Sequence, residues 1–251
     1  MSVRQGIIGG VVIELRDRDE IEALEAAGSV AAAVLRAVGE HAVTGVSLAE
    51  LDEVAREVAD RAGARPLGDQ VISTSLNDEI TGGPPDSRVP EDGDLLSVAV
   101  TLHLEGWCTR AATSLVLGTA RPQDQALIDA TRQALADGIA AAQPGARLGA
   151  VCRAIGLVGR SAGYGIPPLG GHGLGRQPRQ EPAVPNDGHP GRGIPLRPGL
   201  VLSIEPIFTA GGRDHLERDN PIVRTGDESR AAHVGHTLVI TDHGPRVLTA
   251  S

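Results

Sequence analysis

The stretch "GGHGLGRQPRQEP", residues 170–182, sets one histidine among four glycines and follows it with two arginines. Glycine has no side chain, so its backbone can lie very close to another group. His172 is therefore predicted to be held against something by this segment. A metal ion, a substrate and the turn itself are the three candidates, and the rest of the chain must distinguish them.

The composition excludes several classes of protein. A chain of 251 residues, 41% of them apolar, can bury a core as one large domain or two small ones. A net charge of −9 argues against a nucleic-acid-binding surface. No apolar run approaches the ~20 residues that span a bilayer, and the first residues do not resemble a signal peptide. Cys108 and Cys152 form no CxxC motif and suggest no disulfide framework. We therefore expect a cytoplasmic protein without nucleic-acid or membrane partners, of unknown oligomeric state.

The order of expected elements is repeated along the chain. Apolar spacing and the capping box "SLAE" at Ser47 predict two helices, after which a β-hairpin follows. Two more helices then precede a second β region that begins near residue 170. The expected helices are 19–42, 47–62, 122–142 and 145–162. This weak internal duplication predicts one domain made of two similar halves.

The hairpin has a definite predicted register. If Glu105-Gly106 is a two-residue turn, the strand partners are fixed. They are His103 with Cys108, Thr101 with Arg110 and Ala99 with Ala112. Cross-strand partners and alternate residues share a face, so these six side chains are expected on one side. The Cys108–His103 pair permits a nucleophilic cysteine, although a small buried cysteine is the commoner outcome.

Five blocks of sequence together resemble the methionine aminopeptidases, whose family also contains prolidases and creatinase. They are residues 20–38, 74–100, 170–184, 196–207 and 236–249, in the family's order and spacing. The resemblance implies an α+β pita-bread fold, in which two pseudo-symmetric halves surround a curved antiparallel sheet covered by helices. It predicts residues 1–13 as an N-terminal extension and 14–251 as a single aminopeptidase-like domain.

The resemblance also implies a set of metal ligands. Members of the family hold two divalent metals through two Asp, one His and two Glu, and bridging carboxylates help such metals to generate hydroxide. The histidine corresponds to His172 and the first glutamate to Glu205. The aspartates correspond to Ala99 and Arg110, and the second glutamate to Gly235. Because two of the five ligands remain, the sequence predicts no metal site and no cofactor.

The replaced positions suggest how the site is rebuilt. We expect Arg110 to lie where the metals would be and to form a bidentate pair with Glu205. The alternative is that this pair only fills the space. Two family histidines correspond to Gly82 and Arg179, and the smaller side chains at Gly82, Ala99 and Gly235 are expected to enlarge the cleft.

The candidate site combines three predicted catalytic residues with seven predicted substrate-binding residues. His172, Glu205 and Arg110 are the predicted catalytic residues, with His172 as general acid or base. A metal ligand and an inherited structural residue are the other interpretations of His172. The predicted substrate-binding residues are Arg179, Gly82, Ala99, Thr101, Cys108, Gly235 and His236.

The expected function is a metal-free enzyme on a methionine-aminopeptidase-like scaffold. It would perform acid–base chemistry (isomerisation, cyclisation, elimination or hydrolysis) on a small molecule bearing a carboxylate or another anionic group. Biosynthesis of a specialised metabolite is the expected setting. A non-catalytic pseudo-peptidase that binds a peptide or protein is the alternative, and a residual one-metal aminopeptidase is the third hypothesis.

Overall fold

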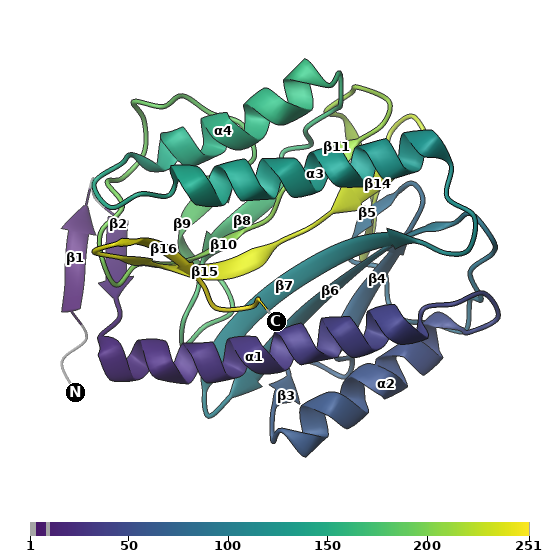
Figure 1. The fold of residues 1–251 in the computed structure, drawn as a ribbon, viewed down its shortest axis with the longest axis horizontal. Coiled ribbons are helices and arrows are strands. Elements are labelled where there is room, and N and C mark those ends of the chain that lie inside the picture. The colour runs from purple at the N-terminus through teal and green to yellow at the C-terminus, as the bar shows by residue number, and fades with distance from the viewer. Residues whose placement is uncertain (1–3, 9–10, 251) are drawn as a thin grey trace.

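The computed structural model describes residues 4–8 and 11–250, which form four helices and sixteen strands (Figure 1). The helices are α1 (Arg18–His41), α2 (Leu48–Arg61), α3 (Pro122–Ala141) and α4 (Leu148–Ser161). Every described strand pairing is antiparallel. A helix pair followed by antiparallel strands occurs twice, which agrees with the expected α+β class and two halves.

Local sequence determines where the helices begin. Ser47 caps α2 through a capping box with Glu50, as predicted. The predicted start of the fourth helix at Gly145 is wrong by three residues. Gly145 has a positive φ of 84°, and Arg147 has extended backbone angles at the helix N-cap, where it bridges Pro195. The chain therefore enters the helix only at Leu148.

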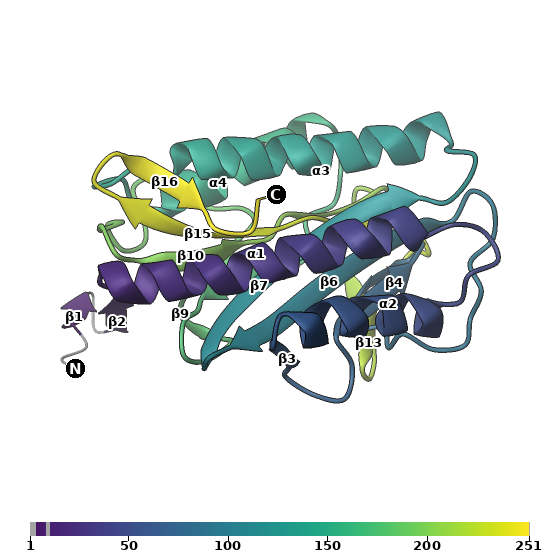
Figure 2. The same ribbon diagram turned by 60° about the horizontal axis from the view of Figure 1, so that its bottom comes forward.

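The first half contains a sheet built on the predicted hairpin. Its strands are β3 (Arg65–Pro66), β4 (Ile72–Leu76), β6 (Leu95–Leu104) and β7 (Trp107–Val116). Glu105 and Gly106 both have positive φ, which is the geometry of a tight type I′ turn. The register places Thr101 opposite Arg110 and Ala99 opposite Ala112, as predicted. Figure 2 shows α1 running across β6 and β7.

The second half contains a five-stranded sheet and the elements around it. The sheet, in spatial order, consists of β16 (Gly244–Val247), β15 (His236–Thr241), β10 (Val201–Ile204), β8 (Gly170–Gly173) and β9 (Gln180–Pro185). The smaller sheets pair β11 (Ile207–Thr209) with β14 (Ala231–His233), and β12 (Leu216–Asp219) with β13 (Ile222–Thr225) and β5 (Glu79–Thr81). Helices α3 and α4 cover this half (Figure 1).

A third small sheet lies at the N-terminal end. It consists of β1 (Arg4–Ile8) and β2 (Val11–Leu15). The expected boundary between an N-terminal extension (residues 1–13) and a domain (residues 14–251) falls within β2. The division itself stays a prediction.

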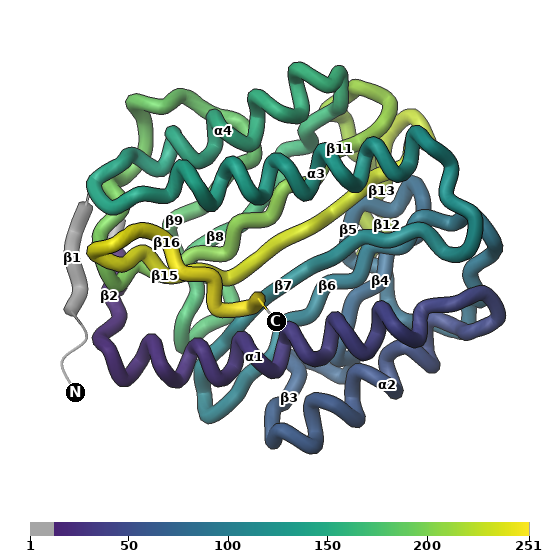
Figure 3. Tube along the Cα trace, in the orientation of Figure 1, coloured from purple at the N-terminus to yellow at the C-terminus, as the bar shows by residue number. Residues whose placement is uncertain are grey.

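The two halves join where β7 meets the strand that leads into β15 (Figure 3). Ala112 and Gly235 exchange two backbone hydrogen bonds, each 3.0 Å long. The backbone N–H of Arg110 donates to Thr237 Oγ1 at 3.0 Å, and Thr237 Oγ1 donates to the Arg110 carbonyl at 2.7 Å. This junction brings Arg110 of the first half against residues of the second half.

Candidate functional site

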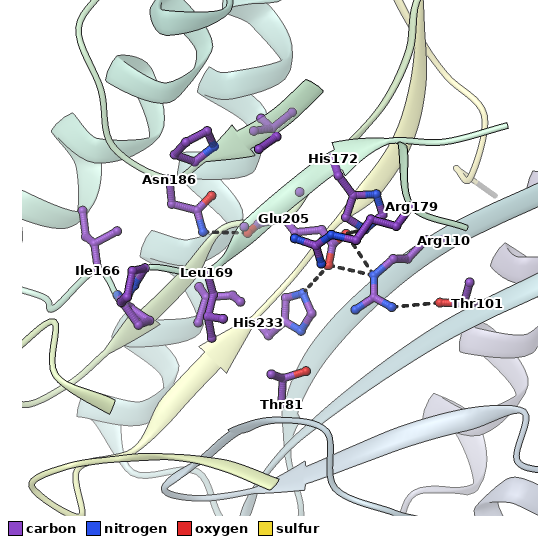
Figure 4. Close-up of a pocket in the computed structure, with 18 of the residues that line it drawn as sticks. Thr81, Thr101, Arg110, Ile166, Leu169, His172, Arg179, Asn186, Glu205 and His233 are labelled. Atoms are coloured by element: carbon purple, nitrogen blue, oxygen red, sulfur yellow. Dashed lines mark hydrogen bonds and ion pairs between the residues drawn. The ribbon is translucent and has the colours of Figure 1, made fainter. Parts of the chain in front are cut away.

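A cleft of about 740 Å³ lies between the two halves and receives side chains from both (Figure 4). Its polar lining includes Thr81, Thr101, Arg110, His172, Arg179, Asn186, Glu205 and His233. A concave site with a few converging polar groups is the usual form of a binding or active site.

Glu205 is the centre of this polar group. It directly follows β10, and only 3% of its side chain is exposed. Its carboxylate accepts hydrogen bonds from Arg110 Nε, Ser203 Oγ and His233 Nε2. Burial alone would raise the pKa of Glu205, but the charge of Arg110 and the hydrogen bonds from His233 and Ser203 hold that pKa well below its usual value. Glu205 is therefore ionised at neutral pH.

Arg110 forms the predicted pair with Glu205, with a different geometry. Its Nε lies 2.9 and 2.8 Å from the two carboxylate oxygens, so one N–H is shared between them. A bidentate pair would use two parallel N–H groups, and the expectation of one is wrong. The reason is Thr101, whose hydroxyl accepts from Arg110 Nη1 at 2.8 Å and turns the guanidinium towards β6.

His172 lies beside this pair with one ring nitrogen fixed. Its Nδ1 is 2.9 Å from the Gly173 carbonyl, so Nδ1 carries the proton and donates it. Its Nε2 then presents a lone pair, 3.8 Å from Glu205 Oε1. Burial lowers the pKa of His172, and the positive charges of Arg110 and Arg179 lower it further. The ring is therefore neutral at pH 7 and can accept a proton at Nε2.

The glycines around His172 have a structural explanation. A Cβ on Gly171 would collide with the Ser203 carbonyl, and a Cβ on Gly173 would collide with the Glu181 carbonyl. Both carbonyls belong to segments that flank β8 in its sheet. The glycines thus allow close packing of β8 between its neighbours, and this packing holds His172 at the cleft.

The missing side chains at Gly82 and Gly235 do not enlarge the cleft. Gly82 has a φ of 85°, and a Cβ there would collide with the Pro221 carbonyl. A Cβ on Gly235 would lie 2.9 Å from Glu205 Cγ, so Glu205 already fills that space. The expectation of a roomier cleft is wrong at both positions because neighbouring groups occupy the room.

The other predicted substrate-binding residues lie at different depths. Arg179 and Thr101 line the cleft, whereas Ala99 is buried in β6 and is not among the lining residues. His236 is packed at the start of β15, where its Nδ1 lies 2.9 Å from Thr249 Oγ1. The substrate-binding roles of these residues, and those of Gly82, Cys108 and Gly235, stay predictions.

Cys108 lies in the core. It is fully buried, packs in a cluster with Trp107 and Leu174, and has His103 Nε2 3.2 Å from its sulfur. Burial raises the pKa of the Cys108 thiol to about 11. A protonated thiol is a poor nucleophile, so the geometry gives no support to a Cys–His nucleophile.

Two residues of the site are absent from the sequence-based prediction. His233 ends β14, and its Nε2 lies 3.1 Å from Glu205 Oε2. Its position two residues before Gly235 was an available signal, since alternate residues of an extended chain share a face. Asn186 donates from Nδ2 to the Glu205 carbonyl at 2.7 Å, and its proline-rich segment carries no signal for this contact.

The donor set does not fit a two-metal centre. Among the described residues, no group of three or more His, Cys, Asp or Glu could hold a metal ion. The Glu205 oxygens already accept hydrogen bonds, and the Arg110 cation is within 3 Å of both. A dication placed there would be repelled by the guanidinium and would lack ligands. The five-ligand set implied by the resemblance is therefore not present, and we derive no step through a metal.

Comparison with known proteins establishes the family. Residues 22–242 match the family described as Metallopeptidase family M24. The chain belongs to this family. It is 42% identical to "Methionine aminopeptidase 1" of Mycobacterium tuberculosis over 96% of both chains, and 36% identical to "Methionine aminopeptidase" of Aquifex aeolicus over 95% of this chain and 99% of that one.

Similarity to solved structures confirms that this chain has the pita-bread fold of the methionine aminopeptidases. The crystal structure of methionine aminopeptidase from Thermotoga maritima matches with a TM-score of 0.92 and 30% identity, covering 95% of this chain and all of the other. Prolidase from Pyrococcus furiosus, at 18% identity and a TM-score of 0.74, shares the fold over 94% of this chain and 65% of its own.

The same relatives correct the predicted function. Proteins 32–42% identical over nearly the full length are named methionine aminopeptidase, a name that states a peptide substrate. The prediction of a metal-free enzyme acting on a small anionic molecule is therefore wrong. The pseudo-peptidase and biosynthesis hypotheses find no support in these relatives either. In the described part of the chain, no helix has the length and apolarity to cross a membrane.

Proposed function

We propose that this chain acts on peptides and takes the N-terminal end of the peptide into the cleft. The observation that carries the proposal is the 42% identity, over 96% of both chains, to a protein named methionine aminopeptidase. The position of Glu205, His172 and Arg110 in one cleft between the halves supports it. A cytoplasmic location is part of the proposal, since both cysteines are free and buried.

Asn186 supports a peptide as the ligand. The side chain lines the cleft and is 2% exposed, and its Nδ2 is committed to the Glu205 carbonyl at 2.7 Å. That bond fixes the orientation of the amide, because only the NH₂ group can donate to a carbonyl. Its Oδ1 is buried and has no hydrogen-bond partner among the described residues. A peptide N–H or the terminal ammonium would supply the donor that this oxygen lacks.

The proposed catalytic residues are His172, Glu205 and Arg110. His172 Nε2 is the proton-accepting atom that faces the cleft, beside the Glu205 carboxylate. Arg110 balances the negative charge of Glu205, and its hydrogen bond to Thr101 holds the guanidinium in position. His172 would exchange a proton with the bound peptide, while Arg110 and Glu205 hold the charges around it.

Binding of a matched peptide pair tests the proposal. The free-amine peptide Met-Ala-Ser-amide and its N-acetylated form are titrated calorimetrically into the protein. We expect the free amine to bind roughly tenfold more tightly, since a charge-assisted hydrogen bond to a buried acceptor contributes on that order. Equal affinities, or no binding by either peptide, would contradict it. Mass spectrometry of the mixtures, with and without added Mn²⁺, reports whether the first residue is released.

A further inference from the structure

The cleft has the opposite charge to the chain as a whole. The sequence carries a net charge of −9. Yet three arginines line the cleft, Arg110, Arg179 and Arg218, against two carboxylates, Glu205 and Asp187. An acidic protein that concentrates cations in its cleft creates a local field that attracts anions.

Both carboxylates of the cleft are already engaged. Glu205 accepts from Arg110, and Asp187 lies 3.3 Å from Arg160. The side chains of Arg179 and Arg218 form no hydrogen bond or ion pair with any other residue of the described structure. The positive charge of the cleft is thus not neutralised by the protein itself.

These two arginines come from different parts of the fold. Arg179 directly precedes β9 and lies in front of His172 and Glu205 (Figure 4). Its charge is near enough to lower the pKa of His172. Arg218 is on β12, in the sheet that also contains β5 of the first half. The cleft is therefore lined by guanidinium groups from two different sheets.

We infer that Arg179 and Arg218 bind a carboxylate of the peptide, so that the cleft prefers peptides with an acidic group close to the N-terminal end. The inference rests on the proposed function and specifies the substrate class of the same site. Guanidinium groups are well matched to carboxylates because they present parallel N–H donors. The buried Asn186 Oδ1 provides the complementary contact, an acceptor for the peptide's N–H.

The carboxylate has two sources in a peptide: an acidic side chain or the free C-terminus of a short peptide. Three peptides separate them: Met-Ala-Ser-amide is neutral apart from its amine, Met-Asp-Ser-amide adds a side-chain carboxylate, and Met-Ala-Ser has a free C-terminus. We expect at least one carboxylate peptide to bind about fivefold more tightly than the neutral amide. That is the range of a solvent-accessible ion pair, and the gain should shrink in 0.5 M salt.

Substitutions test whether the two arginines cause the tighter binding of carboxylate peptides. In the Arg179→Gln/Arg218→Gln double variant, the carboxylate peptides should bind no better than the neutral amide. Both side chains are solvent-exposed and have no partner among the described residues, so the variant should fold, and its thermal melting checks this. Arg36→Gln is the control, because Arg36 is exposed on α1 and does not line the cleft. It should keep the gain.

The outcomes distinguish the inference from the function on which it rests. If the neutral amide binds as tightly as both carboxylate peptides, or if the gain survives in the double variant, the inference is overturned while peptide binding stands. If no peptide binds, the proposed function fails and the inference fails with it.

Discussion

Arg110 shares a single guanidinium N–H, at Nε, between the two carboxylate oxygens of Glu205, at 2.9 and 2.8 Å. Glu205 is almost fully buried, whereas a quarter of the Arg110 side chain remains exposed. The buried carboxylate therefore depends on a cation that reaches it from the rim of the cleft. This dependence has consequences for stability, for acid unfolding and for the titration of His172.

Replacing Arg110 should expose that dependence. Arg110→Ala leaves the Glu205 carboxylate buried, with Ser203 and His233 as its remaining hydrogen-bond donors among the described residues. We expect the free energy of unfolding in urea to fall by about 3 kcal/mol, as for other broken buried pairs. Arg110→Ala/Glu205→Gln should recover part of the loss, because the uncompensated charge is gone. Arg18→Ala, which breaks an exposed pair on α1, is the control and should leave stability unchanged. A loss no larger than that of the control would contradict the interpretation.

Acid should destabilise the protein through Glu205. The pKa of this group is lowered in the fold, so the unfolded chain takes up its proton first as the pH falls. The stability that Glu205 contributes is complete above its unfolded pKa of about 4.5 and declines below it. The measurement is the urea midpoint between pH 7 and pH 3. Glu205→Gln should show a shallower decline, and parallel curves for the two proteins would show that other carboxylates cause the effect.

The packing around β8 should tolerate no side chain at Gly171. Gly171→Ala places a Cβ against the Ser203 carbonyl of the adjacent strand, and we expect a loss of about 2 kcal/mol or more from the resulting shift. Gly39→Ala is the matched control. Gly39 lies in α1 with no atom within 4 Å of an added Cβ. That change should stabilise the protein by roughly 0.5–1 kcal/mol, because alanine favours the helix. Similar melting shifts for both variants would count against the packing argument.

The thiols should be unreactive in the folded protein. Burial raises the pKa of Cys108 and that of Cys152 to about 11, so neither forms a thiolate at neutral pH. With an aromatic disulfide reagent at pH 7.5, we expect no absorbance change within the time in which the urea-unfolded chain releases two equivalents. A fast single equivalent from the native protein, lost in Cys108→Ala, would reinstate Cys108 as a nucleophile.

Short-range rules predicted the framework of this site. The two-residue turn at Glu105-Gly106 fixed the hairpin register, and register alone placed Thr101 opposite Arg110. The pairing of Arg110 with Glu205 also followed, because the family resemblance brought together strands far apart in sequence.

The features of the site that the sequence did not predict depend on contacts between segments distant in the sequence. The Pro221 carbonyl over Gly82 and the Glu205 side chain against Gly235 occupy space that a sequence comparison assigns to the cleft. Asn186 reaches the Glu205 carbonyl from a proline-rich segment without periodicity. These contacts join segments that are distant in the sequence, and no local pattern encodes them.

The pKa of His172 responds to three charged residues of the cleft, so its titration reports on all of them. Burial lowers the pKa of His172, and Arg110 and Arg179 lower it further, while Glu205 opposes them. The NMR signals of its ring should therefore titrate with a midpoint below 6.5. Arg179→Gln should move that midpoint upward, because it removes a positive charge, and Glu205→Gln should move it downward. Arg36→Gln, which changes an exposed residue of α1 outside the cleft, should leave the midpoint unchanged. If Arg179→Gln has no effect, Arg179 does not act on the atoms around Glu205, and its assignment to a carboxylate of the peptide loses its electrostatic support.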